Sequence, residues 1–212
     1  FGNLKNVLDE NSSQTEILVL ESPFVANAEF DVMVKQFGDQ VTFIDCTFAA
    51  KADADTLRQG LERIRAEAED AVRSGASHLV LTDEHQGAEK VAMPMILATS
   101  AVHSWLTRKG LRTFCSINVR SAECIDPHYF AVLIGCGATT VNAYLAQDSI
   151  ADRVRRGLIE GSLVDAVRRY RDATSEIPLR PRCAFPPSLL AVRRGDAPWH
   201  FQATRSVTTE MQ

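Results

Sequence analysis

The chain has 212 residues, of which 45% are hydrophobic and 24% are charged, and its net charge is −4. This composition is typical of one α/β domain with a hydrophobic core. We expect neither a nucleic-acid nor a membrane partner, because no basic patch stands out and no apolar run approaches the roughly 20 residues of a membrane span.

The first third of the chain predicts alternating strands and helices after a polar start. Asn27 is a suitable N-cap for the first helix, and Gly75 is a suitable end for the long second one. That second helix carries apolar residues at three- and four-residue steps, as in Leu57, Leu61 and Ile64. In chain order we expect a connector, a strand, a helix, a strand and a helix at residues 1–15, 16–21, 28–37, 41–46 and 53–74.

The following hundred residues continue this alternation. Pro94 suits the first turn of a helix, Asp126 is a suitable N-cap before Pro127, and Gly161 separates the last two helices. We expect strands at 78–83, 112–119 and 139–142, and helices at 94–109, 127–137, 149–161 and 162–173.

About five βα units joined by short linkers predict an α/β fold with a mainly parallel sheet. Periodicity alone does not choose between an open doubly wound sheet and part of a (β/α) barrel. After Asp172 the pattern stops and the prolines cluster, which predicts an irregular tail over 174–212. The polar N-terminus lacks an initiator methionine and a signal-peptide core, so we expect a cytoplasmic chain cut from a longer one.

The chain has an odd number of cysteines and no C-x-x-C spacing. This pattern favours reduced, mostly buried thiols over disulfides or metal ligands. Cys46 follows a strand, yet it would need a nearby base or a helix N-terminus to act as a nucleophile. The five cysteines are Cys46, Cys115, Cys124, Cys136 and Cys183.

Polar residues follow three of the predicted strands, where α/β proteins place their sites. The sequence Asp83-Glu84-His85 is the most enzyme-like, because a carboxylate beside an imidazole can perform general acid–base catalysis. Neighbouring loop residues point in different directions, however, so a solvated turn or a helix cap is the simpler interpretation. Asp45 follows the second strand, and Asn118, Arg120 and Glu123 surround the end of the fourth.

Other candidate residues have structural interpretations. His103 and His128 stand alone on predicted helices, without a metal-binding spacing. Arg120 and Glu123 are expected to pair with each other or with a neighbouring domain. Gly135-Cys136-Gly137 follows a helix and precedes a strand, which is the reverse of a phosphate loop. We therefore expect a helix end with positive φ at Gly135 or Gly137.

Several long stretches resemble the central domain of the glutamate synthase large subunit. They include ESPFVANAEF, MPMILATSAVHSWLTRKGLRTFCSINVRSAE, PHYFAVLIGCGATTVNAYLA and LVDAVRRYRDA, and residues 2–23 resemble the connector that enters that domain. The resemblance runs from about residue 2 to residue 173, which predicts a central domain over residues 16–173.

The resemblance implies a part in glutamate synthesis from glutamine and 2-oxoglutarate. In this family the central domain joins a glutamine amidotransferase domain to an FMN-binding synthase domain with a 3Fe-4S cluster, and helps to wall the ammonia channel between them. It is α/β with barrel-like features. The family also implies a small NAD(P)H-oxidising subunit as partner, and we expect an NADPH-type parent enzyme.

The family's catalytic and cofactor residues fall outside this chain, so we assign no catalytic, cofactor-binding or metal-binding residue. The segments 120–123 and 142–144 match family motifs and are expected to serve packing or domain contact. After residue 173 the chain departs from the family, which suggests a truncated or frame-shifted product. The alternative function is a stand-alone enzyme that uses Asp83, Glu84 and His85.

Overall fold

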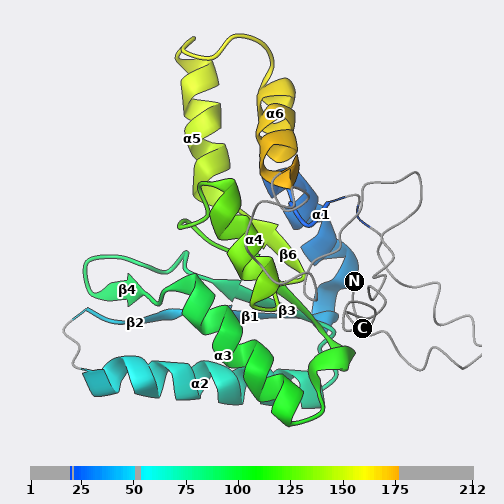
Figure 1. Cartoon of the computed structure of the whole chain (residues 1–212), viewed down its shortest axis with the longest axis vertical. Coiled ribbons are helices and arrows are strands. Elements are labelled where there is room, and N and C mark those ends of the chain that lie inside the picture. Colours follow the sequence, from blue (N-terminus) through cyan, green and yellow to red (C-terminus); the bar gives the residue numbers. More distant parts are fainter. Residues whose placement is uncertain (1–19, 21, 51–53, 177–212) are drawn as a thin grey trace, which may run out of the picture.

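Four parallel strands form the central sheet of the molecule (Figure 1). The computed structural model describes residues 20, 22–50 and 54–176. The strands are β1 (Val41–Asp45), β3 (His78–Thr82), β5 (Ser116–Arg120) and β6 (Thr140–Asn142). They are neighbours in the order β1-β3-β5-β6. The predicted α/β fold with a mainly parallel sheet and alternating βα units is confirmed.

Three helices cover one face of this sheet. They are α2 (Ala54–Arg73), α3 (Met95–Arg108) and α4 (Pro127–Gly135). Each lies between two neighbouring parallel strands in the chain, and right-handed crossovers in one direction bring such helices to the same face. Their buried side chains, such as Ile64 and Leu133, share one hydrophobic core with Leu79 and Leu81 of β3.

Helix α1 (Asn27–Phe37) covers the opposite face. Its Phe30 and Met33 pack with Val80, which points away from Leu79 and Leu81 because side chains alternate along a strand. At the end of α1 the ring of Phe37 stacks on His78, with 4.0 Å between the ring centroids. The sheet therefore has helices packed on both of its faces.

The residues before α1 lie beside β6. Phe24 forms a parallel bridge with Val141. The Val25 N–H donates to the Val141 carbonyl at 3.0 Å, and the Val141 N–H donates to the Pro23 carbonyl at 2.8 Å. Helix α1 therefore carries the chain across the sheet from the β6 edge to β1. The strand order is that of a segment of a (β/α) barrel, and α1 occupies the face that would line the barrel interior.

A short antiparallel ribbon extends beyond the sheet. It consists of β2 (Thr47–Ala49) and β4 (Lys90–Ala92), with Phe48 opposite Val91. The sequence analysis did not predict this ribbon, since three-residue strands are too short to show a period. It lies beyond the carboxyl ends of β1 and β3, next to the predicted strand-end residues.

Helices α5 (Tyr144–Arg155) and α6 (Leu163–Glu176) form a hairpin that projects from the sheet (Figure 1). The predicted helix over 149–161 is wrong in its bounds, because α5 begins earlier and the chain turns at Gly157 with φ of 70°. The Ser162 hydroxyl accepts a hydrogen bond from the Asp165 N–H at the start of α6. Helix α6 continues through residues 174–176, beyond the predicted domain end.

Other predicted bounds hold or fail for local reasons. Asp126 caps α4 as predicted, accepting from the Tyr129 N–H at 3.0 Å. Asn27 is the first residue of α1 and does not cap it, because Ala26 occupies the N-cap. The predicted strand over 112–119 is wrong at its start, where the 3-10 helix η3 (Arg112–Phe114) precedes β5.

The predictions for the two ends of the chain cannot be compared with this fold. The connector over 1–15, most of the strand over 16–21 and the tail beyond 176 lie outside the described residues. Within the part of the chain that the structure describes, no helix combines the length and the apolar character needed to cross a membrane.

Candidate functional site

Polar side chains gather at the carboxyl end of the parallel sheet, as the sequence predicted. Asp45 ends β1, Asp83 follows β3, Arg120 ends β5 and Asn142 ends β6. In open α/β sheets this end of the strands is the usual place for a site. The contacts of each side chain decide whether it is available for chemistry.

Asp83 is fully buried and serves as an anchor for the loop after β5. Its Oδ2 accepts from the Ser121 hydroxyl at 2.7 Å and from the Ala122 N–H at 2.9 Å. Burial raises the pKa of the Asp83 carboxyl, although these hydrogen bonds favour its charged form. The carboxylate therefore joins two loops and has no exposed face for a substrate.

Glu84 forms an ion pair with Arg120 across the strand ends. The Arg120 Nε lies 2.8 Å from the Glu84 Oε2, and the Arg120 side chain is only 15% exposed. Burial works to raise the pKa of Glu84, but the hydrogen bond and charge of Arg120 hold it below its usual value. Of the two alternatives for Arg120 and Glu123, the pairing with each other is wrong, because the Arg120 guanidinium pairs with Glu84. Contact with a neighbouring domain stays a prediction.

Asn142 connects the end of β6 with the start of α1. Its Nδ2 donates to the Val25 carbonyl and to the Asn27 Oδ1, each at 2.9 Å. Its Oδ1 accepts from the Arg120 Nη1 at 2.8 Å. The guanidinium of Arg120 also lies 5.2 Å from the centre of the Tyr144 ring. The motif segments 120–123 and 142–144 therefore meet, and they form an internal packing contact.

His85 lies apart from its sequence neighbour Asp83 and close to Asp45. Its Nδ1 is 3.8 Å from the Asp45 Oδ1, and its side chain is 63% exposed. The Asp45 Oδ1 also accepts from the Thr47 hydroxyl at 2.7 Å, and Lys90 Nζ lies 3.4 Å from its Oδ2. Burial works to raise the pKa of Asp45, but its hydrogen bond with Thr47 and the charges of Lys90 and His85 lower it.

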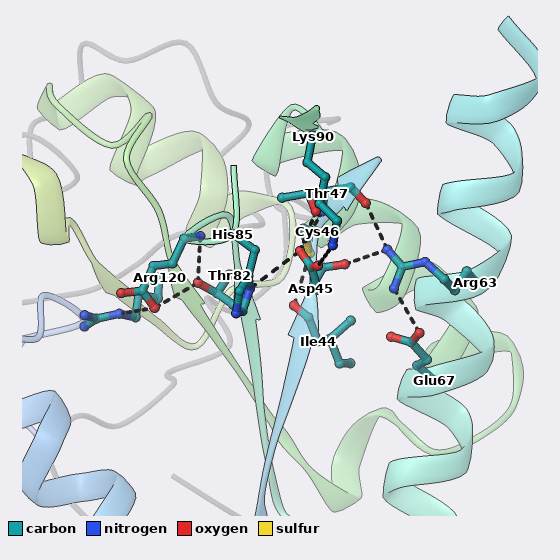
Figure 2. A network of polar contacts seen from close by, with 11 residues as sticks. Ile44, Asp45, Cys46, Thr47, Arg63, Glu67, Thr82, His85, Lys90 and Arg120 are labelled. Carbon is teal, nitrogen blue, oxygen red and sulfur yellow. Dashed lines mark hydrogen bonds and ion pairs between the residues drawn. The ribbon is translucent and has the colours of Figure 1, made fainter. Parts of the chain in front are cut away.

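Cys46 is a core residue, as the simpler interpretation predicted. It is fully buried, and burial raises the pKa of its thiol to about 12. The chain around it is held by Arg63 of α2, whose Nη2 donates to the carbonyls of Asp45 and Thr47 at 2.7 and 3.0 Å. Figure 2 shows Arg63 reaching from its helix to these strand-end carbonyls.

Glu123 has a structural role that its sequence position did not reveal. Its Oε2 accepts from the Met95 N–H at 3.0 Å, at the N-terminus of α3, and also accepts from the Tyr129 hydroxyl. Burial and this carboxylate raise the pKa of Tyr129. Glu123 therefore ties α3 to α4, and no local sequence signal connects it with a helix that begins 28 residues earlier.

The Gly135-Cys136-Gly137 segment closes α4, which confirms the predicted helix end. Gly137 has φ of 110°, whereas Gly135 lies inside the helix. A Cβ at Gly137 would lie 2.2 Å from the His103 Nδ1. That nitrogen accepts from the Arg112 Nε at 3.0 Å, and burial lowers the pKa of His103. A histidine side chain, and not a phosphate, fills the space beside this glycine.

Two other histidines have contrasting environments. His128 is exposed on α4. His78 is buried beneath Phe37, and its Nδ1 has no hydrogen-bond partner among the described residues. Burial lowers the pKa of His78 to about 4. The sequence analysis did not select His78, although a polar residue at the start of the apolar strand HLVLT was a signal.

The described cysteines do not fit an iron–sulfur cluster. Burial raises the pKa of the thiols of Cys46, Cys115 and Cys124, whereas cluster ligands are thiolates. Within residues 20, 22–50 and 54–176, no group of three or more histidine, cysteine and acidic side chains is placed to hold a metal ion. The described residues therefore offer no ligand set for the iron–sulfur cluster of the family.

The family model of the glutamate synthase central domain matches residues 1–177. The chain belongs to this family. It is 58% identical over 158 residues to the glutamate synthase [NADPH] large chain of Azospirillum brasilense, covering 74% of this chain and 10% of that relative.

Two further relatives have related names. The chain is 38% identical over 123 residues to the glutamate synthase [NADPH] large chain of Bacillus subtilis, and the match covers 58% of this chain and 8% of the relative. The chain is 36% identical over 151 residues to the chloroplastic ferredoxin-dependent glutamate synthase of Spinacia oleracea, and the match covers 70% of this chain and 9% of the relative. The chain thus spans about a tenth of the length of these curated relatives.

Proposed function

We propose that this chain acts as a structural domain within a glutamate synthase large subunit. In that role it joins the glutamine amidotransferase domain to the FMN-binding synthase domain and helps to wall the ammonia channel between them. The parent enzyme makes glutamate from glutamine and 2-oxoglutarate. The catalytic nucleophile, FMN and 3Fe-4S cluster belong to the other domains.

The observation that supports this role is the engagement of the strand-end polar groups by one another. Asp83 accepts hydrogen bonds from Ser121 and Ala122, and Glu84 pairs with Arg120. A general base needs an accessible lone pair within reach of a substrate proton. These groups instead connect β3, β5 and β6, as a scaffold requires.

The alternative of a stand-alone enzyme gains no support from these contacts. It requires Asp83 and His85 to act together, but His85 lies beside Asp45 and Asp83 is buried beneath the loop after β5. Cys46, the other candidate nucleophile, is a protonated core thiol. We therefore assign no catalytic residue to the chain.

The parent enzyme is proposed to be of the NADPH type, with a small NADPH-oxidising subunit as partner. The support is the name of the relative with 58% identity, the NADPH enzyme of Azospirillum brasilense. We also propose a cytoplasmic location, which the same bacterial likeness supports. Neither nucleic acid nor membrane is a proposed partner.

The proposal is tested in a large chain of Azospirillum brasilense whose matched region is replaced by residues 1–177 of this chain. We expect this chimera to bind FMN and to oxidise NADPH in the presence of glutamine, 2-oxoglutarate and the small subunit. His85→Ala in the chimera should leave kcat and KM within about twofold, because the side chain touches no reacting group. A folded, FMN-loaded His85→Ala chimera without turnover would contradict the scaffold role.

A further inference from the structure

At the free edge of β1, the backbone groups of Phe43 point outward and have no partner among the described residues. The Cys46 N–H donates to the Thr82 carbonyl, and the Gln40 carbonyl accepts from the Ser77 N–H. The backbone N–H and C=O groups of the even-numbered residues of β1 therefore face β3. Because this direction alternates from residue to residue, the backbone groups of Phe43 and Asp45 face the free edge. The Asp45 carbonyl accepts from Arg63 of α2, which agrees with this direction.

The neighbour expected at this edge lies elsewhere. In a barrel segment with strands in chain order, the extended segment before β1 would pair with β1. In this chain that segment, at Pro23 and Val25, is hydrogen-bonded to Val141 on the far side of the sheet. No described strand takes the vacant place beside β1. Strand edges with free backbone groups are sites for strand addition.

The surface beside the β1 edge is hollowed and acidic. A cavity of about 390 Å³ lies between β1 and α2. Of its three carboxylates, Glu67 pairs with Arg63 at 2.9 Å, whereas Asp39 and Asp70 have no ion pair among the described residues.

An apolar side chain borders the same edge on the α1 side. Phe43 is 48% exposed, and its ring meets Phe30 edge-on with 6.4 Å between the centroids. A strand placed beside β1 would cover the exposed part of this ring with its own side chains. The edge thus combines free hydrogen-bonding groups, an apolar ring and uncompensated negative charge.

We propose that the free edge of β1 receives an extended, positively charged segment from the rest of the glutamate synthase large chain, which pairs with β1 as an added strand. This rests on the proposed function, since the relative with 58% identity continues for nine times the length matched here. Backbone hydrogen bonds to Phe43 give the docking its register. Lysine or arginine side chains of the segment face Asp39 and Asp70.

The charge argues against the nearest extended sequence of this chain as the occupant. Residues 16–21 read EILVLE, and Glu16 and Glu21 would add to the negative charge of Asp39 and Asp70. A second copy of this chain would bring β1 edge against β1 edge and would double the same acidic surface. A basic segment from another part of the large chain meets neither difficulty.

Hydrogen–deuterium exchange tests the pairing, with the neighbouring amide as an internal control. In the 212-residue chain, the Phe43 amide should exchange quickly and the Ile44 amide, which faces β3, slowly. In the chimeric large chain, the Phe43 amide should slow by about tenfold or more, while the Ile44 amide changes little. An unprotected Phe43 amide in the folded chimera overturns the proposal.

Two matched pairs of variants separate strand pairing from side-chain burial and from charge. Phe43→Pro removes the edge N–H and the ring, whereas Phe43→Thr removes the ring alone. The Asp45 amide, which faces the same edge, should therefore lose its protection in the proline chimera and keep it in the threonine chimera. In a chimera that keeps Phe43, Asp70→Lys should reduce the protection of the Phe43 amide against exchange severalfold. Glu62→Lys, which changes an exposed acid on α2 outside the cavity, should not.

The remaining outcomes also decide the proposal. Protection of Phe43 in the isolated chain that rises with protein concentration would indicate a second copy as the occupant and overturn it. Concentration-independent protection in the isolated chain would indicate a segment of the chain itself and overturn it too. An inactive chimera that still protects Phe43 would contradict the proposed function while leaving the strand pairing supported.

Discussion

The two edges of the parallel sheet are built differently. At the β6 edge, Val141 exchanges backbone hydrogen bonds with Pro23 and Val25, and the buried amide of Asn142 donates to the Val25 carbonyl. At the β1 edge, no described strand pairs with the outward backbone groups, the Asp45 carbonyl accepts from the Arg63 side chain, and Phe43 is half exposed. Among the described residues, the sheet is therefore completed on the β6 side and open on the β1 side.

The aspartates that follow two neighbouring strands express the same difference. Asp83, after β3, is fully buried, and burial raises its pKa. Asp45, at the end of the edge strand β1, is 29% exposed, and its pKa is lowered because Thr47, Lys90 and His85 outweigh its partial burial. The position of a strand within the sheet, more than the residue type that follows it, decides how a strand-end carboxylate behaves.

The largest effect is expected from Asp83→Ala, which we predict to cost about 4 kcal/mol of unfolding free energy because two buried donors lose their acceptor. Urea unfolding at pH 7 measures this loss. Asp83→Asn, which keeps an acceptor oxygen, should cost less than half as much. Asp45→Ala should cost about 1 kcal/mol; an equal cost at both positions would remove the contrast between the two strands.

His78 extends the comparison to the amino end of the sheet. Its pKa is lowered to about 4 in the folded chain, so the unfolded chain binds the proton first as the pH falls. Its contribution to stability is present above the ordinary pKa and is lost as the pH falls towards 4, by about 3 kcal/mol between pH 7 and pH 4.

The measurement for His78 is the unfolding free energy of the wild type and of His78→Phe across this pH range. The phenylalanine variant keeps an aromatic ring against Phe37 and should lack this part of the pH dependence. His85→Phe, a change at an exposed histidine, is the control and should keep the wild-type slope. Equal slopes for wild type and His78→Phe would show that this histidine does not couple folding to pH.

A smaller loss is expected at the β6 edge. Asn142→Ala removes donors from Val25 and Asn27 and an acceptor from Arg120, and we predict a cost of about 2 kcal/mol. Thermal unfolding of the isolated chain provides the measurement. Thr42→Ala in the edge strand is the control and should cost about 0.5 kcal/mol. A larger loss at Thr42 than at Asn142 would reverse the order of the two edges.

The smallest effects belong to the exposed charges around Asp45. Lys90 is 57% exposed and His85 is 63% exposed, so their ion pairs with Asp45 are screened by water. Lys90→Ala and His85→Ala should each change the unfolding free energy by no more than about 0.5 kcal/mol at pH 7. A loss comparable to that of Asn142→Ala would mean that the contacts around Asp45 stabilise the fold more than their exposure to water indicates.

The fold was predictable where one physical pattern extended over many residues. The apolar steps of Leu57, Leu61 and Ile64 identified α2, and Asp126 before Pro127 identified the start of α4. Prediction failed where distant contacts override local preference. Arg112 was assigned to a strand, but its guanidinium donates to the carbonyls of Cys115 and Gly137, and a 3-10 turn places it there.

The candidate site was predictable in its location but not in its pairings. Parallel strands bring their carboxyl ends together, so the residues that follow the predicted strands, Asp83 and Arg120 among them, belong to the same end of the sheet. No sequence pattern indicates that Arg120 forms its ion pair with Glu84 and not with Glu123, which is three residues away in the chain. The ion pair with Glu84 follows from the register of β3 against β5, in which Thr82 lies opposite Arg120. In addition, the Glu123 carboxylate already accepts a hydrogen bond from the first residue of α3.

The route of α1 across the sheet has a consequence for how the chain folds. The hydrogen bond between Asn142 and Val25 joins residues 117 positions apart, and closing a flexible loop of that length costs about 4 kcal/mol. During synthesis, the segment before α1 leaves the ribosome early but must wait for β6 to emerge before it can pair. Contacts of this range slow folding, so the β6 edge should form last, whereas β1 is available to neighbours from an early stage.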